Sequence, residues 1–190
     1  SQGGTPDIAA AAVAVQGFPA LERVLHAGEG ASDCVIARPI AANLHTIATE
    51  MLADWTEGDT PFRKAMTEPG SGAGVYFTYS ESLTALMTGA LSSLEGVIRL
   101  RLKRPMGEDS GTPRPKRVEA WRSGLSMDLI RADLAAVADF YGGEGARVDG
   151  ALRQNGEIEL ADLMTKAFRL TQETAAKIDT PLTEAVADPA

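Results

Sequence analysis

Apolar residues recur at helical spacing over several long segments of this chain, and no strand pattern competes with them. Alanine and leucine are abundant, whereas runs of β-branched residues are short, and this composition favours helices packed through small and medium side chains. We expect long helices over residues 7–27, 33–57, 80–103, 126–141 and 157–178, with short helical pieces over 60–67 and 118–122. Helices joined by short or moderate loops predict an all-α fold, an antiparallel helical bundle.

The length of 190 residues fits one domain with a sizeable core. We therefore expect a single helical domain over residues 1–190, interrupted by a polar, proline-containing linker at 108–115. The first residues look like a loop, so a leader or an upstream domain could precede them.

Composition narrows the classes of function. A net charge of −8 repels a phosphate backbone, so we expect no binding of nucleic acid. No run of 18 apolar residues is present, and this predicts no transmembrane segment in the chain. The single cysteine, Cys34, excludes an intrachain disulfide framework, and its helical apolar pattern predicts a small core residue.

The first helical segment contains a carboxylate within its apolar stripe. The pattern places Glu22 on the inward face together with Phe18 and Leu25, and a buried carboxylate needs a partner. His26 follows four residues later and is therefore its neighbour on the helix. Two interpretations stay open: a half-buried pair near a helix C-terminus, or half of a site for a metal or polar ligand. Pro19 lies inside the expected helix and predicts a kink.

These residues also carry a family resemblance. Residues 17–22 resemble the Gly-x-His-x-x-Glu signature of imelysin-like proteins, a family first named for an insulin-cleaving membrane protease. The segments 34–55, 101–107 and 119–126 are also similar to that family. Gly17 and Glu22 match the signature, whereas Pro19 stands where the family has its histidine.

The resemblance implies a bacterial envelope protein, periplasmic or anchored to the outer membrane and often a lipoprotein. Such proteins are linked to iron acquisition and have two helical-bundle parts around a cleft. Family members carry another helical region before this one, so we expect that N-terminal helices, and a lipid anchor on them, are absent from this chain. Proline has no metal-binding atom in its side chain, which argues against metal binding by the signature alone.

These residues supply few of the groups that a peptidase needs. It needs a metal-bound water with a general base, or an activated nucleophile. The chain has two histidines, His26 and His45, and the apolar neighbours of His45 predict a half-core position. We expect a binding protein associated with metal or iron uptake, without peptidase activity. The alternatives are a metal-dependent peptidase of the family and a structural module whose site has decayed.

The candidate site residues come from two parts of the chain. Arg122 is expected to neutralise Glu22 or to bind an anion, and Ser126 to cap the following helix or contact a ligand. The predicted ligand-binding residues are Gly17, Glu22, Arg122 and Ser126, and the predicted metal ligands are Glu22 and His26, for iron or zinc. The predicted partners are a metal ion or small anionic ligand and envelope transport proteins.

Basic residues gather in one stretch of this acidic chain. Seven of the eighteen lie between positions 99 and 117: Arg99, Arg101, Lys103, Arg104, Arg114, Lys116 and Arg117. Two interpretations stay open. These cations either interact with the negative end of a helix dipole and keep the linker exposed to solvent, or they form a local binding site for an anion or a lipid headgroup.

Overall fold

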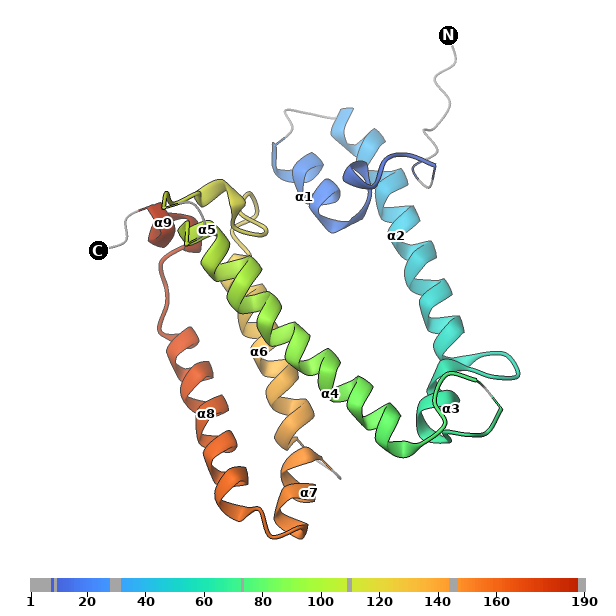
Figure 1. The fold of residues 1–190 in the computed structure, drawn as a ribbon. Coiled ribbons are helices and arrows are strands. Elements are labelled where there is room, and N and C mark those ends of the chain that lie inside the picture. The colour runs from blue at the N-terminus through green and yellow to red at the C-terminus, as the bar shows by residue number, and fades with distance from the viewer. Residues whose placement is uncertain are drawn as a thin grey trace. The chain divides into compact units, whose positions relative to one another are not determined.

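The computed structural model describes residue 8 and residues 10–27, 32–72, 74–108, 111–143 and 147–187, and its regular structure is helical throughout this part (Figure 1). The all-α prediction is confirmed. In chain order the elements are η1 (Val13–Val15), α1 (Gly17–Ala27), α2 (Ser32–Thr56), α3 (Phe62–Thr67), α4 (Tyr79–Gly96), η2 (Val97–Lys103), α5 (Arg104–Met106), η3 (Pro115–Arg117), α6 (Ser126–Gly142), α7 (Val148–Gln154), α8 (Ile158–Ala176) and α9 (Leu182–Ala187).

The chain divides into two compact units, residues 1–86 and 87–190, with the boundary inside α4. The segment 108–115, expected to be a linker, lies in the second unit, and residues 109 and 110 are outside the described residues. The single domain and the linker stay predictions. None of the described helices combines the length and the apolarity that crossing a bilayer requires.

The first unit is built on the pair formed by α1 and α2. Its core consists of Ile8, Ala20 and Ile40, and Leu21, Val24 and Leu44 pack against it. Small residues such as Ala20 let the two helix backbones approach closely. Asn43 on α2 donates a hydrogen bond of 3.3 Å to the side-chain oxygen of Gln16, which fixes the approach to α1.

The start of α1 differs from the expected helix over residues 7–27. The helix begins at Gly17, whose φ of +81° is open to glycine at little cost, and a short 3₁₀ turn precedes it. Pro19 therefore stands in the first turn, where its missing N–H has no partner to lose. The predicted kink is not needed, because the proline opens the helix. Residues 7 and 9 lie outside the described part.

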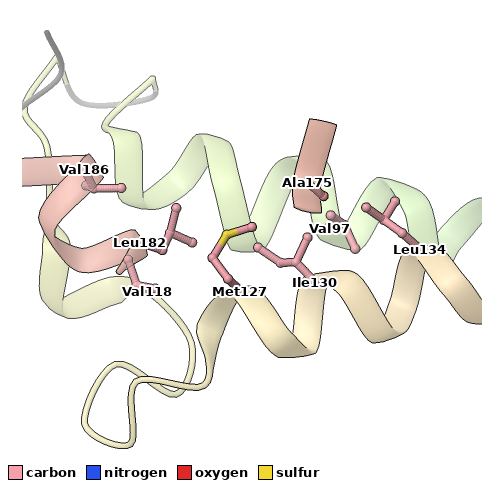
Figure 2. Packing of buried hydrophobic residues seen from close by; sticks show 8 residues of the cluster. All are labelled: Val97, Val118, Met127, Ile130, Leu134, Ala175, Leu182 and Val186. Carbon is pink, nitrogen blue, oxygen red and sulfur yellow. The ribbon is translucent and has the colours of Figure 1, made fainter. Parts of the chain in front are cut away.

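The second unit joins α6 and α8 to the end of the α4–η2–α5 helix (Figure 1). Figure 2 shows its core, in which side chains of η2, α6, α8 and α9 meet Val118. The buried members are Val97, Val118, Met127, Ile130, Leu134, Ala175, Leu182 and Val186. Trp121 packs against this cluster as a half-buried side chain.

A π-helical stretch, η2, stands directly before Pro105. Proline has no N–H to donate and crowds the preceding turn, and a widened turn relieves this crowding. The helix then ends at Gly107, where φ is +82° and a Cβ atom would lie 2.3 Å from the carbonyl oxygen of Thr112. Residues 118–122 form turns, so the short helix expected there is wrong; η3 precedes them instead.

Two short helices, α7 and α9, were not expected from the sequence. The first lies between α6 and α8, and a polar network holds it against both helices. The single hydroxyl proton of Tyr141 is shared between the carbonyl oxygen of Ala161 at 3.0 Å and the Asp149 carboxylate at 3.4 Å. Arg153 pairs with Asp149 at 3.0 Å and with Asp162 at 2.8 Å. Bonds to residues of α6 and α8 thus stabilise a helix whose sequence carries a weak signal.

Candidate functional site

Glu22 lies on the side of α1 that faces away from the core of its unit. Ala20, Leu21 and Val24 of α1 contact that core. Phe18, four residues before Glu22, is 74% exposed, and Leu25, three residues after it, is 56% exposed. Glu22 itself is half-buried. The expected inward face is therefore wrong: α1 has a wide apolar arc, and α2 covers another part of it than the part that holds the carboxylate.

The residues around Glu22 share its part of the helix surface. Pro19 precedes it by three positions and His26 follows it by four, so both are neighbours of the carboxylate, and both are exposed. Phe18 and Leu25 add exposed apolar surface beside it. The structure thus presents Glu22 and His26 on an apolar, outward face of the first unit.

This face fits a metal site only in part. Glu22 supplies a carboxylate and His26 an imidazole, which are ligands that zinc and iron accept, but Pro19 supplies no donor. Across the residues that the structure describes, no three histidine, cysteine, aspartate or glutamate side chains gather closely enough to hold a metal ion. Zinc sites use three or four protein ligands, so this pair is an incomplete set.

Gly17, the first residue of the signature, has a conformational role. Its positive φ lets the chain turn from η1 into α1, so that Pro19 and Glu22 follow in the first two turns. A direct contact of Gly17 with a ligand stays a prediction.

Arg122 belongs to the turn segment before α6 in the second unit. Its guanidinium carbon lies 4.3 Å from the centre of the Trp121 ring, and Lys116 lies 5.8 Å from the same ring. Both contacts are cation–π interactions, and that of Arg122 holds its half-buried side chain against the ring. Ala120, the residue before Trp121, adopts a φ of +52°, and this backbone conformation costs an alanine about 1 kcal/mol. The pairing of Arg122 with Glu22, a residue of the first unit, stays a prediction.

Ser126 does not cap α6. Leu125 occupies the N-cap position without a side-chain bond, and Ser126 is the first helical residue. Its buried hydroxyl donates a hydrogen bond to the backbone carbonyl of Glu119 instead. The prediction of a cap is wrong, because the chain returns over the start of α6 and offers a carbonyl acceptor; a ligand contact of Ser126 stays a prediction.

Two residues expected in or near the core are exposed. Cys34 lies in the first turns of α2 and is exposed, and so is His45 in the middle of the same helix. The buried side of α2 is formed by Ala37, Ile40 and Leu44 against α1, and no described element covers the positions of Cys34 and His45. Periodicity identified α2 as a helix, but the core position predicted for Cys34 and the half-core position predicted for His45 are wrong.

Sequence reasoning missed the role of Arg101. Its guanidinium bridges the carboxylates of Glu119 and Asp133, the first at 2.6 Å, and its side chain is 24% exposed. This ion-pair network ties η2 to α6 and to the segment that carries Trp121 and Arg122. The sequence shows a cation here but does not identify the two acids, which lie 18 and 32 positions further on.

Comparison with known proteins gives one family. The family model described as Imelysin (peptidase M75) matches residues 2–190, almost the full length of the chain. No curated protein and no solved structure matches the chain. The match covers both units, including the signature-like segment of α1 and the η2–α5 end. The chain therefore belongs to the imelysin family.

Proposed function

We propose that this chain is part of an imelysin-like envelope protein that binds a metal ion or a small anionic ligand in metal uptake and has no peptidase activity. The observation that carries the proposal is the family match over residues 2–190, read together with Pro19 at the position of the signature histidine. Imelysin proteins are generally found in the envelope or outside the cell.

The chemistry of α1 supports binding rather than catalysis. A half-buried carboxylate, Glu22, stands beside an exposed imidazole, His26, on an apolar face. This pair can anchor a metal ion whose remaining positions are filled by the incoming ligand. Hydrolysis would also need a bound water and a general base in fixed positions, and Pro19 offers neither a ligand nor a base.

Arg122 is the second element of the proposal. A guanidinium presents a planar fork of hydrogen-bond donors that matches a carboxylate or another anion. We infer that Arg122 clamps an anionic ligand, so loss of Arg122 should weaken anion binding and leave metal binding unchanged.

The test is a thermal-shift and calorimetric screen of the wild type with iron, zinc and small anions. We expect at least one ligand to raise the melting temperature, and Glu22→Gln to reduce this shift. The matched control is Glu50→Gln, which removes an exposed carboxylate from α2. Equal shifts in wild type and Glu22→Gln, or no shift with any ligand, would overturn the proposal.

The peptidase alternative is tested in the same preparation. Chelator-sensitive cleavage of a protein substrate, together with metal retained after purification, would replace our proposal by a metallopeptidase. Absence of any ligand response would favour a structural module whose site has decayed.

A further inference from the structure

The second unit contains an apolar groove that the function proposed above does not use. Its volume is about 620 Å³, and it runs between the α4–η2 helix and α8, with α6 beneath it. Ile130 and Leu134 of α6 form part of its lining, and Leu94 and Leu170 lie on the facing helices. Every lining residue belongs to the second unit.

The lining has the chemistry of a site for hydrocarbon. Its polar side chains are Thr171 and Thr174, whose hydroxyls already donate to the backbone carbonyls of Ala167 and Leu170. Large apolar side chains stay partly open to solvent, among them Leu170 at 45%. Volumes of about 300–1,000 Å³ are usual for small-molecule sites, and this groove lies within that range. A ligand here gains by burying apolar surface.

The groove continues towards the end of η2. A second hollow of about 530 Å³ shares Ile98 and Leu102 with the first and extends to Met106. It is also lined by Lys103 and Glu108, which form an ion pair of 2.9 Å with both side chains about half exposed. An exposed pair of this kind contributes about 0–1 kcal/mol, so an anionic ligand can exchange for Glu108 at the ammonium group at little cost.

Further cations gather at this end of the unit. Arg104 follows Lys103. The backbone N–H of Arg114 donates a hydrogen bond of 2.7 Å to the carbonyl oxygen of Pro105, which brings the basic residues of segment 114–117 to the same end of the unit. Lys116 and Arg117 lie in η3, which contacts α5. Arg104, Arg114 and Arg117 are exposed. In a chain with a net charge of −8, this is a local positive field.

From these two observations we propose that the groove binds a single-chain anionic amphiphile. The acyl chain lies along the apolar lining between η2 and α8, and the carboxylate or phosphate head meets Lys103 and Arg104. Positive charge at one end of the groove fits a ligand with one charged head at the end of its chain. A helix from a second copy or another protein would need complementary groups along its whole length.

The groove lining is tested by calorimetry with dodecanoate below its micelle concentration. We expect Leu170→Glu, which places a carboxylate among the apolar lining, to weaken binding at least tenfold. Leu163→Glu is the matched control, because Leu163 lies on the same helix, is 62% exposed and does not line the groove. We expect the control to stay within twofold of the wild type. Ile98→Gln on the facing wall provides a second variant, since Ile98 is also exposed.

The cationic end is tested by changing the ligand and the head site together. Dodecanol should bind at least tenfold more weakly than dodecanoate, and acetate and inorganic phosphate should not displace dodecanoate from the groove. A monoacyl phosphatidylglycerol distinguishes a lipid source from a free fatty acid by its affinity. Lys103→Gln with Arg104→Gln should weaken dodecanoate at least fivefold and leave dodecanol unchanged. The exposed pair Arg63→Gln with Lys64→Gln on α3 is the control.

Several results would overturn the proposal. These are no dodecanoate binding in the wild type, equal affinity for dodecanol and dodecanoate, or equal effects of the two leucine variants. A dimer seen by light scattering and abolished by Leu170→Glu would show that a second copy covers the groove. None of these outcomes involves Glu22, so failure here is distinguishable from failure of the proposed function.

Discussion

Replacing Pro19 by histidine introduces the donor that the Gly-x-His-x-x-Glu signature, which residues 17–22 resemble, has at its third position. Pro19 is exposed and lies in the first turn of α1, where a side chain meets no described neighbour of the core. An imidazole there would stand three residues before Glu22, on the same part of the helix surface. We therefore expect Pro19→His to fold and to bind zinc more tightly than the wild type.

The size of the effect follows from two opposing terms. Loss of the proline lowers the stability of the metal-free protein by about 0.4–1 kcal/mol through the freedom of the unfolded chain. Zinc binding at least tenfold tighter adds about 1.4 kcal/mol of stabilisation at a fixed zinc concentration well above both dissociation constants. For a chain of this size the added stabilisation corresponds to a rise of about 3–6 °C in melting temperature.

The assay compares thermal melts with and without zinc for the wild type, Pro19→His and Pro19→Ala. The alanine variant makes the same backbone change without a donor, so it should lose the stability of the proline and gain no zinc response. Adding Glu22→Gln to Pro19→His should remove the gain. Equal zinc shifts in Pro19→His and Pro19→Ala would refute the reasoning that the missing imidazole limits metal binding.

Three further predictions concern the second unit. Gly107→Ala should lower the free energy of unfolding, measured in urea, by more than about 3 kcal/mol, because its Cβ would overlap a backbone carbonyl. Gly124 also has a positive φ but has open space around it, so Gly124→Ala should lower this free energy by about 1 kcal/mol. Tyr141→Phe should lower the melting temperature by about 2–4 °C, since it removes a hydroxyl bonded to a buried carbonyl; a change under 0.5 °C would contradict this. Arg153 holds the pKa of Asp149 below its usual range through a hydrogen bond. The stability that this adds is present above the unfolded pKa of about 3.9 and is lost as pH falls through the folded pKa, so Asp149→Asn should flatten the acid limb of stability measured between pH 2 and 6.

Helix positions were largely readable from periodicity. The expected helices over 33–57, 126–141 and 157–178 agree with α2, α6 and α8 within two residues at each end. The segment 80–103 also agrees, although its last turns are π-helical, and the sequence shows only the proline that follows. Spacing of apolar residues every three to four positions is a local property, and it needs no knowledge of neighbours.

Faces and partners were harder to predict. Glu22, Cys34 and His45 were all assigned to the wrong surroundings, because α1 and α2 are apolar over a wider arc than one neighbour can cover. The bond from Ser126 to Glu119 has the same origin: the acceptor is supplied by a return of the chain. Helical spacing says which residues share a face, but not which face another element covers.

The spacing of apolar residues along the sequence predicts a helical chain, its basic residues gather between positions 99 and 117, and residues 17–22 resemble a family signature with Pro19 in the place of the histidine. The fold leaves the half-buried Glu22 and the exposed His26 on the part of α1 that α2 does not cover, joins Arg101 to two distant acids, and forms an apolar groove that reaches Lys103. The physical reason is that helix formation depends on neighbours three or four residues apart. Burial, ion pairing and groove shape depend on contacts between residues tens of positions apart.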